Sequence, residues 1–416
     1  MNAATAPTVV VAFHDGFYGH GTGAGRCNRA LLDSLVGSLA PGVRLVVLPI
    51  YLRPDSPEYD AGWHAATQAV VTKVGGHVVP FDNGTGGMRR FAGLDGFRRA
   101  SASAADIISR LMPEARPMLI VASDVPFYGL APLLSERVRA HTVAIAHSTA
   151  VLHDPDDHAR IAWEQHGLRE MVAYGGHVAA ISTHMRRHLV TEYDLPANTI
   201  VDLIDGLTSD EWRIPAPQTR LLPAAAAGGF LLGYGRAEPY KGWDDLLDAI
   251  SLAGPLPHTV LAAVTEGREL SPYQCHLARR IADERLNVTL LPRFHPGVRS
   301  LLAHPGLAAL VVPSRVEPFG RIPLEAFVAG AAPVVATTAG GLAHLVLHEQ
   351  TGYSAAPEDP RSLAAAIRRA VDADPRERAR LRQAGRQLVA TRHDYERNIR
   401  GFLHRLAPWA LALGGR

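Results

Sequence analysis

The chain has 416 residues, more than one hydrophobic core usually serves, so two domains of about two hundred residues each are expected. Its 42 Lys and Arg are matched by 40 Asp and Glu, which argues against nucleic acid as a partner. Cys27 and Cys275 are too few and too distant for a disulfide framework, and no apolar run reaches the roughly 18 residues of a membrane helix. We therefore expect a cytoplasmic protein without an integral membrane segment.

Short apolar runs alternate with helical patterns along the first half of the chain. The runs predicted as strands are Val9–Phe13, Leu45–Ile50, His77–Pro80, Met118–Ala122, Val143–Ala146, His177–Ile181 and Thr199–Leu203. Helical periodicity between them, for example from Arg29 to Val36, separates one strand from the next. Nearly continuous apolar strands that alternate with helices indicate a parallel sheet covered on both faces.

The composition changes between Asp205 and Gly229, where Pro, Ala and Gly accumulate, and we interpret this segment as a linker. The alternation then restarts with a second set of apolar runs. The predicted strands are Phe230–Tyr234, Thr259–Val264, Val288–Pro292, Ala308–Pro313 and Ala332–Ala336. A second doubly wound domain is therefore expected after the linker.

The last predicted element is a helix from Tyr395 to Arg416, which can lie on the surface or return to the first domain. We predict a first domain over residues 1–208, a second over 209–392 and this terminal helix over 393–416. The expected fold class is α/β, with two Rossmann-like, doubly wound domains facing across a crevice.

The most informative segment lies between two glutamates, Glu317 and Glu325, and follows the predicted strand that ends at Pro313. A carboxylate in a strand-to-helix loop and another about one and a half helical turns further on lie on one rim of an α/β crevice. That arrangement suits two hydroxyl-rich parts of one ligand. Pro323 fits a first helical turn and Gly330 the residue after the helix end, so free N–H groups near Glu317 suit an anion.

Two basic residues, Arg236 and Lys241, follow Gly235 directly after the first strand of the second half. At the carboxyl end of a strand they place two fixed positive charges where such folds bind ligands, and a diphosphate is the natural guest. Together they could replace a divalent metal. A solvated loop at a helix start is the alternative interpretation of these residues alone.

A glycine-rich loop from Gly16 to Gly25 follows the first predicted strand. Its glycines allow backbone N–H groups to approach a phosphate or sugar, although a flexible surface loop is the simpler alternative. The match to the dinucleotide fingerprint is discounted because no acidic residue follows the second strand. His147 follows another strand, where it can hydrogen-bond a sugar hydroxyl, whereas isolated histidines are more often structural.

Two loops of the second half offer weaker candidates. Phe294, beside Arg293, could line a base pocket, although core packing is the commoner fate of a lone phenylalanine. Gly340 and Gly341 lie at a further strand-to-helix turn, where a close backbone approach to a ligand and a plain turn are equally compatible with the sequence.

In order and spacing, these segments resemble the retaining GT-B glycosyltransferases of family 4, the glycosyl transferases group 1. The resemblance lies chiefly in the second half, in Gly235-Arg236 with Lys241-Gly242, in the Glu317 to Glu325 segment and in Gly340-Gly341. The first half matches more weakly, through the glycine loop, His147 and Asp205-Gly206 where the family usually has Asn-Gly.

The resemblance implies catalysis by Arg236, Lys241, Glu317 and His147. The two basic residues would neutralise the diphosphate of a nucleotide-sugar donor, UDP-linked, without a metal or other cofactor. Glu317 would bind hydroxyls of the donor sugar, and His147 would contact the same sugar from the first domain. The anomeric configuration of the sugar would be retained.

The resemblance also implies donor contacts from four further positions. The N–H groups of Phe319 and Gly320 would assist Glu317, Glu325 would hold the ribose, and Gly23 would face the phosphates or the acceptor. Arg321 stands where the family usually has an aliphatic residue, so it is a candidate for a ligand contact or a plain surface arginine at a helix start.

The acceptor site is expected in the first domain, where Asp15, Asp82 and Asp124 are the main candidates, with Trp63 and Asn83 nearby. Several carboxylates would suit an amine-bearing small molecule, such as an aminocyclitol or amino sugar of secondary metabolism. The alternatives left open are a nucleotide-sugar epimerase, a phosphorylase, and a sugar-binding protein that keeps the fold without the chemistry.

Overall fold

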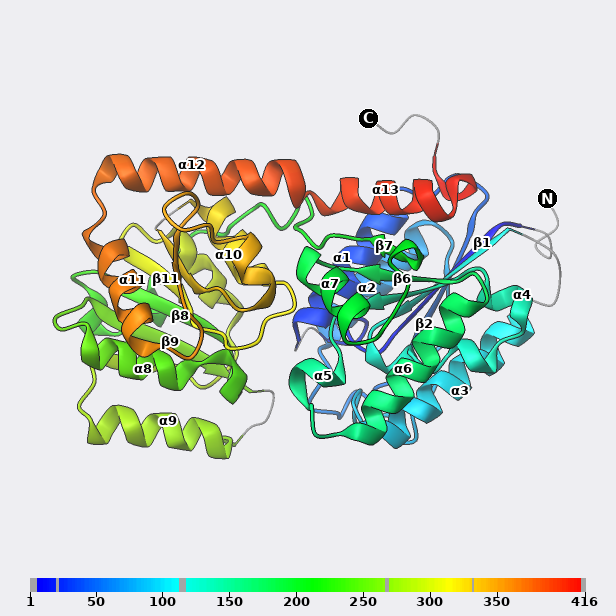
Figure 1. The fold of residues 1–416 in the computed structure, drawn as a ribbon, viewed down its shortest axis with the longest axis horizontal. Helices are drawn as coiled ribbons and strands as arrows, with labels where there is room; N and C mark the ends of the chain where they lie inside the picture. The colour runs from blue at the N-terminus through cyan, green and yellow to red at the C-terminus, as the bar shows by residue number, and fades with distance from the viewer. Residues whose placement is uncertain (1–5, 20–21, 112–116, 266–268, 331–332, 413–416) are drawn as a thin grey trace. The chain divides into compact units, whose positions relative to one another are not determined.

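The computed structural model describes residues 6–19, 22–111, 117–265, 269–330 and 333–412. The chain divides into two compact units, the first formed by Met1–Asp205 with Tyr395–Arg416 and the second by Gly206–Asp394 (Figure 1). The sequence placed these boundaries after residues 208 and 392. The terminal helix groups with the first unit, where it packs against the first helix of the chain.

The described part of the first unit contains one seven-stranded parallel sheet with helices on its faces. Its strands are β1 (Thr8–Phe13), β2 (Arg44–Pro49), β3 (His77–Val78), β4 (Met118–Ser123), β5 (Thr142–Ala146), β6 (His177–Ala180) and β7 (Ile200–Asp202). Its helices are α1 (Gly23–Val36), α2 (Ala61–Lys73), α3 (Gly93–Leu111), α4 (Glu136–Arg139), α5 (Ala150–His153), α6 (His158–Ala173), α7 (Thr183–Thr191) and α13 (Tyr395–Leu406). The strand order is β3-β2-β1-β4-β5-β6-β7.

Within the described residues, the second unit repeats this plan with six parallel strands in the order β10-β9-β8-β11-β12-β13. Its strands are β8 (Phe230–Arg236), β9 (His258–Val264), β10 (Val288–Leu290), β11 (Leu307–Val312), β12 (Val334–Thr337) and β13 (Tyr353–Ala355). Its helices are α8 (Trp243–Leu252), α9 (Pro272–Asp283), α10 (Arg321–Ala329), α11 (Pro360–Asp372) and α12 (Pro375–Arg392).

Burial explains why the apolar runs become central strands. Every residue of β1 is buried, because β1 pairs with β2 on one side and β4 on the other and helices cover both faces. Small residues such as Ala100 and Ala104 let α3 approach the sheet closely, and burial of each large apolar side chain contributes roughly 1.5–3 kcal/mol. In the second unit α8 and α11 pack on one face, and α10 and α12 lie on the other (Figure 1).

Each sheet reverses its strand order at one place, between β1 and β4 in the first unit and between β8 and β11 in the second. Ligands of open α/β sheets bind at the carboxyl ends of strands beside such a switch point. The predicted pair of doubly wound α/β domains is confirmed, and the fold places its candidate residues at these two edges.

Three expectations differ from the structure. The predicted terminal helix ends at Leu406, because Pro408 cannot continue it and opens the 3-10 turn Pro408–Ala410. The segment from residue 206 to 229 is not a free linker, because Leu207 and Ala226 are buried and Gln218 N–H donates to Ser300 Oγ over 2.9 Å. The short strand β13 does not coincide with an apolar run and was not predicted. Ala332 at the start of a predicted strand, and residues 413–416 at the end of the predicted helix, lie outside the described residues.

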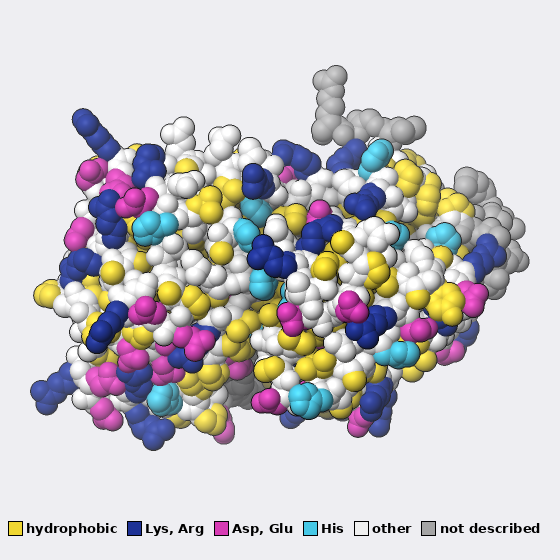
Figure 2. Space-filling model, viewed as in Figure 1, with side chains coloured by type: hydrophobic (Ala, Val, Ile, Leu, Met, Phe, Trp, Pro, Cys, Tyr) yellow, Lys and Arg dark blue, Asp and Glu magenta, His cyan; other side chains and the backbone are white. Residues whose placement is uncertain are grey.

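Two surface properties follow from the sequence. Along the described ranges no helix combines the length and apolar character needed to cross a membrane. Basic and acidic side chains are interspersed over the face shown in Figure 2.

Candidate functional site

The two basic residues of the second unit lie at the end of β8. Arg236 is its last residue, and Lys241 ends the 3-10 turn Pro239–Lys241. The indole N–H of Trp243 donates to the Arg236 carbonyl over 2.8 Å and holds the strand end in place. The Tyr240 ring contacts both cations, with its centroid 5.6 Å from the Arg236 guanidinium carbon and 5.5 Å from Lys241 Nζ. Arg236 is exposed, so its guanidinium is accessible to an anion.

Gly242 locks this turn against the end of β11. It has φ 71°, and a Cβ there would lie 2.0 Å from the Pro313 carbonyl oxygen, so only glycine fits. Arg315, two residues further on, makes a bidentate ion pair with Asp245 at 2.7 and 2.8 Å. These contacts hold the Lys241 turn against the loop after β11.

Glu317 lies in that loop and accepts a 2.6 Å hydrogen bond from Lys241 Nζ. The side chains are 14 % and 15 % exposed, so their attraction is stronger than that of a surface pair. The structure thus joins the predicted cation and the predicted sugar-binding carboxylate, which are 76 residues apart in sequence.

Close glycine contacts shape the loop between Glu317 and α10. Gly320 caps the helix with φ 105°, and its Cβ would meet Leu342; Gly341 passes so near Phe319 that a Cβ would lie 2.4 Å from the Phe319 carbonyl oxygen. The Gly341 N–H donates to the Glu317 carbonyl over 2.8 Å. The Phe319 side chain is buried, which leaves the backbone N–H for the predicted ligand contact; that contact remains a prediction.

Glu325 lies in α10 and is 5 % exposed. Its Oε2 accepts a 2.7 Å hydrogen bond from the Tyr234 hydroxyl, and Arg299 Nε lies 3.3 Å from the same oxygen. These partners fix the rotamer of the carboxylate predicted to hold a ribose. Neither Tyr234 nor Arg299 carries a recognisable motif, and sequence reasoning missed both.

Arg321 stands where the family usually has an aliphatic residue. Its side chain contacts the first residues of the second unit. Its guanidinium donates to the Gly206 carbonyl over 2.7 Å and to the Glu211 carboxylate. Although burial alone would raise the pKa of Glu211, the Arg321 charge and the Thr208 N–H hold it below its ordinary value. These contacts give Arg321 a structural role; its predicted donor contact remains a prediction.

The predicted base-pocket residues lie after β10. Phe294 is 43 % exposed, unusual for a large apolar side chain, and the Arg293 guanidinium donates to the Glu269 carbonyl over 3.1 Å. Arg293 also pairs with Thr265, which places this loop beside the carboxyl end of β9. Their contact with a nucleotide remains a prediction.

In the first unit, polar residues directly follow three neighbouring strands: His14 and Asp15 follow β1, Asp124 follows β4, and His147 follows β5. The sheet register aligns Phe13 with Ser123 and Ser123 with Ile145, so these residues share one edge. His14 Nε2 lies 3.7 Å from Asp124 Oδ2. His147 Nε2 lies 3.2 Å from Ser123 Oγ.

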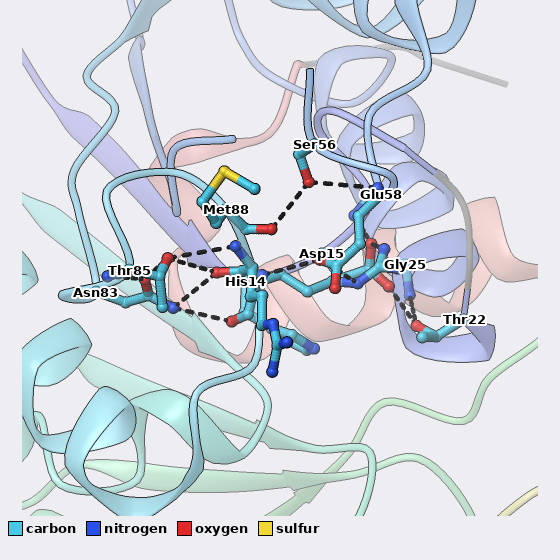
Figure 3. Close-up of polar contacts among 12 residues, drawn as sticks. His14, Asp15, Thr22, Gly25, Ser56, Glu58, Asn83, Thr85 and Met88 are labelled. Atoms are coloured by element: carbon cyan, nitrogen blue, oxygen red, sulfur yellow. Dashed lines mark hydrogen bonds and ion pairs between the residues drawn. The ribbon is translucent and has the colours of Figure 1, made fainter. Parts of the chain in front are cut away.

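Asp15 is the centre of a buried charge cluster (Figure 3). It receives a 2.5 Å hydrogen bond from Arg90 Nη1, another from the Thr22 hydroxyl and one of 2.7 Å from the Gly16 N–H. Arg90 also lies 3.3 Å from Glu58. We call His14, Asp15, Glu58, Arg90 and Asp124 the acceptor-end cluster. Sequence reasoning missed His14, Glu58 and Arg90, because no local motif joins them.

The other acceptor candidates build the loops around this cluster. Asp82 accepts from the N–H groups of Gly84 and Gly87, and Asn83 donates to the Arg89 and Arg90 carbonyls. Trp63 donates to the Gly16 carbonyl over 2.9 Å and braces the glycine loop. Direct contact of these residues with an acceptor remains a prediction.

The glycine loop is shaped by Gly16 and Gly25 more than by Gly23. A Cβ on Gly25 would lie 2.6 Å from the Asp15 carboxylate, and one on Gly16 would lie 2.2 Å from the Gly25 carbonyl oxygen. Gly23 begins α1 with nothing within 4 Å of its Cβ position, which leaves its predicted ligand contact untested. His20 and Gly21 of this loop lie outside the described residues.

Comparison with known proteins decides the family. The model of the family "Glycosyl transferases group 1" matches residues 225–388. A D-inositol 3-phosphate glycosyltransferase from Frankia alni is 31 % identical over 293 residues, which cover 66 % of this chain and 69 % of the relative. The chain belongs to the glycosyl transferases group 1 family.

Other relatives of this group 1 glycosyltransferase share less of the chain. A glycogen synthase from Mycobacterium tuberculosis is 34 % identical over 209 residues, and the match spans about half of each protein, 50 % of this chain and 48 % of the relative. Among solved structures, sucrose-phosphate synthase from Thermosynechococcus elongatus superposes with a TM-score of 0.73 at 19 % identity over 96 % of this chain and 98 % of that one. The HepE protein of Anabaena, solved with UDP-glucose, has a TM-score of 0.68 at 18 % identity and covers 96 % and 99 %. These neighbours confirm the GT-B type of fold.

Proposed function

We propose that this group 1 glycosyltransferase moves a hexose or amino-hexose from a UDP-linked sugar to a hydroxyl of a small-molecule acceptor of secondary metabolism, with retention of configuration, in the cytoplasm. The observation that carries the proposal is the 2.6 Å contact between Lys241 and Glu317 at the adjoining ends of β8 and β11, beside exposed Arg236. The HepE protein of Anabaena was solved in complex with UDP-glucose, which supports the choice of donor.

In this proposal the diphosphate binds at Arg236 and Lys241. An ammonium group has three donors, so Lys241 can keep its contact with Glu317 while it donates to a phosphate oxygen. The N–H groups at the start of α10, at Phe319 and Gly320, add partial positive charge. As the bond between sugar and diphosphate breaks, negative charge grows on the leaving group, and these fixed donors stabilise the transition state more than the ground state.

In this proposal the two glutamates bind the donor through hydrogen bonds and transfer no proton. The partly buried Glu317 carboxylate accepts hydrogen bonds from hydroxyls of the donor sugar, and Glu325, held by Tyr234 and Arg299, accepts from the ribose hydroxyls. The acceptor hydroxyl attacks on the face of the leaving group, and a phosphate oxygen takes its proton. The positive charges supplied by the chain would make a metal unnecessary. In the described part of the chain no group of three His, Cys, Asp or Glu residues is arranged to hold one.

The proposal is tested first by donor binding. Thermal-shift assays of the full chain with UDP, ADP and GDP, each alone and as its glucose conjugate, report ligands that bind the folded state by mass action. The largest rise in Tm is expected with UDP and UDP-glucose. Slow release of UDP from UDP-glucose should accompany it even without an acceptor. A panel in which no nucleotide raises the Tm would contradict the proposal.

A further inference from the structure

Three large apolar side chains are exposed around the acceptor-end cluster of the first unit. Tyr51 is 38 % exposed, Met88 37 % and Phe91 41 %, and they lie on the loops that follow β2 and β3. Exposed large side chains that gather beside polar groups are typical of small-molecule sites. A single exposed apolar side chain is ordinary on a protein surface, whereas a group of them beside polar residues indicates a binding site.

Specific contacts bring the loop after β2 against the loop after β3, and one of the three side chains, Phe91, contacts the cluster. The loop after β3 passes Tyr51 so closely that a Cβ on Gly87 would lie 2.8 Å from the Tyr51 ring. Met88 Sδ accepts a hydrogen bond of 2.6 Å from Arg53. The ring of Phe91 meets the His14 imidazole edge to face, with centroids 5.1 Å apart. Phe91 is therefore an exposed apolar ring directly above the buried polar groups.

The polar groups beneath are rich in carboxylates. Asp15, Glu58 and Asp124 belong to the cluster, and its one guanidinium, Arg90, already contacts two of them. Arg160, whose charge also reaches Asp124, is bound to Glu164 over 2.9 Å. Burial lowers the pKa of His14 to about 4, against the opposing charge of Asp15, so His14 is neutral at neutral pH. Within the cluster, three carboxyl groups therefore stand against one guanidinium.

The imidazole of His14 and the carboxylate of Asp124 have unused hydrogen-bonding capacity. His14 and Asp124 have side chains only 2 % and 6 % exposed, and within the part of the chain that the structure describes His14 Nδ1 and Asp124 Oδ1 have no hydrogen-bond partner. Such groups are costly to bury and often mark sites that a ligand completes. Asp124 also adopts φ 78°, a strained conformation for a residue other than glycine, as is common at binding sites.

Burial raises the pKa of Asp124, and the charge of His147 opposes this without cancelling it. The carboxylate is therefore desolvated and incompletely compensated, and an approaching cation would relieve that cost more than a neutral group would. A phosphate in the same place would meet three carboxylates and one guanidinium, Arg90, which already contacts Asp15 and Glu58.

From these contacts we infer an acceptor subsite at the ends of β1 and β4 that selects an amine-bearing polyol ring over its phosphorylated counterpart. Asp124 binds the ammonium group, His14 bonds a neighbouring hydroxyl, and Phe91 stacks on the apolar face of the ring. This inference rests on the proposed glycosyl transfer and deepens it. It separates the chain from the Frankia alni relative, whose name specifies D-inositol 3-phosphate.

The test compares acceptors that share a ring and differ in one substituent. One series is myo-inositol, an inosamine and D-inositol 3-phosphate; the other is glucose, glucosamine and glucose 6-phosphate. Transfer from UDP-glucose by the full chain is followed by mass spectrometry of the product, and acceptor binding by saturation-transfer NMR. The amine is expected to have the highest kcat/KM of its series in at least one of the two. The inference is overturned if the amine is the best member of neither series, whether the phosphate or the neutral ring is preferred, all three are used equally, or none of them binds.

Three substitutions sharpen the comparison. Asp124→Asn keeps a side chain that tolerates positive φ, and it should raise the KM for the amine roughly 10- to 100-fold because a charged hydrogen bond is lost. Glu58→Gln leaves Arg90 less compensated and should move the preference toward the phosphate member. Phe91→Ala should weaken all three members alike, about tenfold or less, because it contacts the ring rather than the substituent.

Matched controls lie elsewhere on the first unit. Asp106→Asn removes an exposed carboxylate of α3, and Leu133→Ala an exposed apolar side chain, and neither should change acceptor preference. The KM for UDP-glucose should stay constant in all five variants. If UDP-glucose neither binds nor is hydrolysed by the unmodified chain, the proposed function fails. If it is hydrolysed and the amine is not preferred, the subsite inference alone fails.

Discussion

The two units share a strand order and a switch point, yet they present opposite charge at the corresponding edges. The second unit offers cations there: Arg236 is exposed, and the partly buried Lys241 is paired with a single carboxylate. The first unit presents buried carboxylates around one committed arginine, Arg90. The family model matches residues 225–388, within the second unit. The family model therefore covers the strand ends that carry the exposed cation and does not cover the carboxylate-rich strand ends of the first unit. In the proposed function the former would bind the diphosphate and the latter the acceptor.

The largest expected effect comes from removing a cation of the second unit. Arg236→Ala or Lys241→Ala should lower kcat/KM for UDP-glucose by roughly 2–4 kcal/mol of transition-state stabilisation, by analogy with one lost oxyanion donor. Steady-state kinetics of UDP release measures it, with Arg279→Ala on α9 as the exposed control. If Lys241→Ala left kcat/KM unchanged, the positive charge of the second unit could not explain catalysis.

A smaller effect is expected from the contact that ties α10 to the opening segment of the second unit. Arg321→Met removes the partner of Glu211 and of the Gly206 carbonyl. Breaking a buried pair typically costs 3–5 kcal/mol, but Glu211 is 24 % exposed, so a loss of about 2 kcal/mol of unfolding free energy is expected. Urea unfolding measures the loss, and hydrogen exchange should show it within residues 206–394 and leave the first unit protected.

The first unit should respond to acid through His188. Burial, with the charge of His184 acting the same way, lowers the pKa of His188 to about 4, and its Nε2 lies 2.7 Å from the Thr149 hydroxyl. A depressed folded-state pKa gives stability that is complete above the unfolded value of 6.5 and is lost as the pH falls toward 4. The unfolding free energy should fall by about 1.5 kcal/mol between pH 7 and 5 through this residue. His188→Gln should flatten that slope, and His166→Gln, an exposed control, should not.

The smallest effect distinguishes the two glutamates of the second unit. Glu325→Gln should weaken UDP binding about fivefold, close to 1 kcal/mol, with kcat at saturating donor nearly unchanged. Glu317→Gln should instead lower kcat, because it loosens the donor sugar beside Lys241. Calorimetry with UDP and saturation kinetics separate the two results. If both variants lost only a titrating step of the pH profile, the glutamates would be proton carriers rather than donor-binding groups.

Much of the fold could be predicted because its strands are apolar on both faces. Runs such as Val9–Phe13 and Val143–Ala146 carry that signal and fall within β1 and β5. By contrast, β13 is three residues of mixed polarity, and the Pro- and Ala-rich segment before Gly229 packs against its own unit through contacts that composition does not reveal. The rest of the fold depended on packing rather than on local pattern.

The candidate sites were predictable to different degrees for the same reason. Arg236, Lys241 and Glu317 stand in short motifs with fixed glycines, so their residue types and spacing indicated a shared edge. His14, Glu58 and Arg90 come together only because loops after β1, β2 and β3 meet, and the exposure of Phe91 is a property of the folded chain. The sequence therefore indicated Arg236, Lys241 and Glu317 directly. For the carboxylate-rich strand ends of the first unit it indicated only the aspartates.

In the proposed reaction the chain transfers a sugar from UDP-glucose with retention, and the cations of the second unit stabilise the departing diphosphate. The most direct test is NMR of the product formed from UDP-α-glucose and the best amine-bearing acceptor, with UDP release measured in the same sample. The account predicts one UDP for each α-linked product. A β-linked product, or UDP release without any linked product for every acceptor tried, would contradict it.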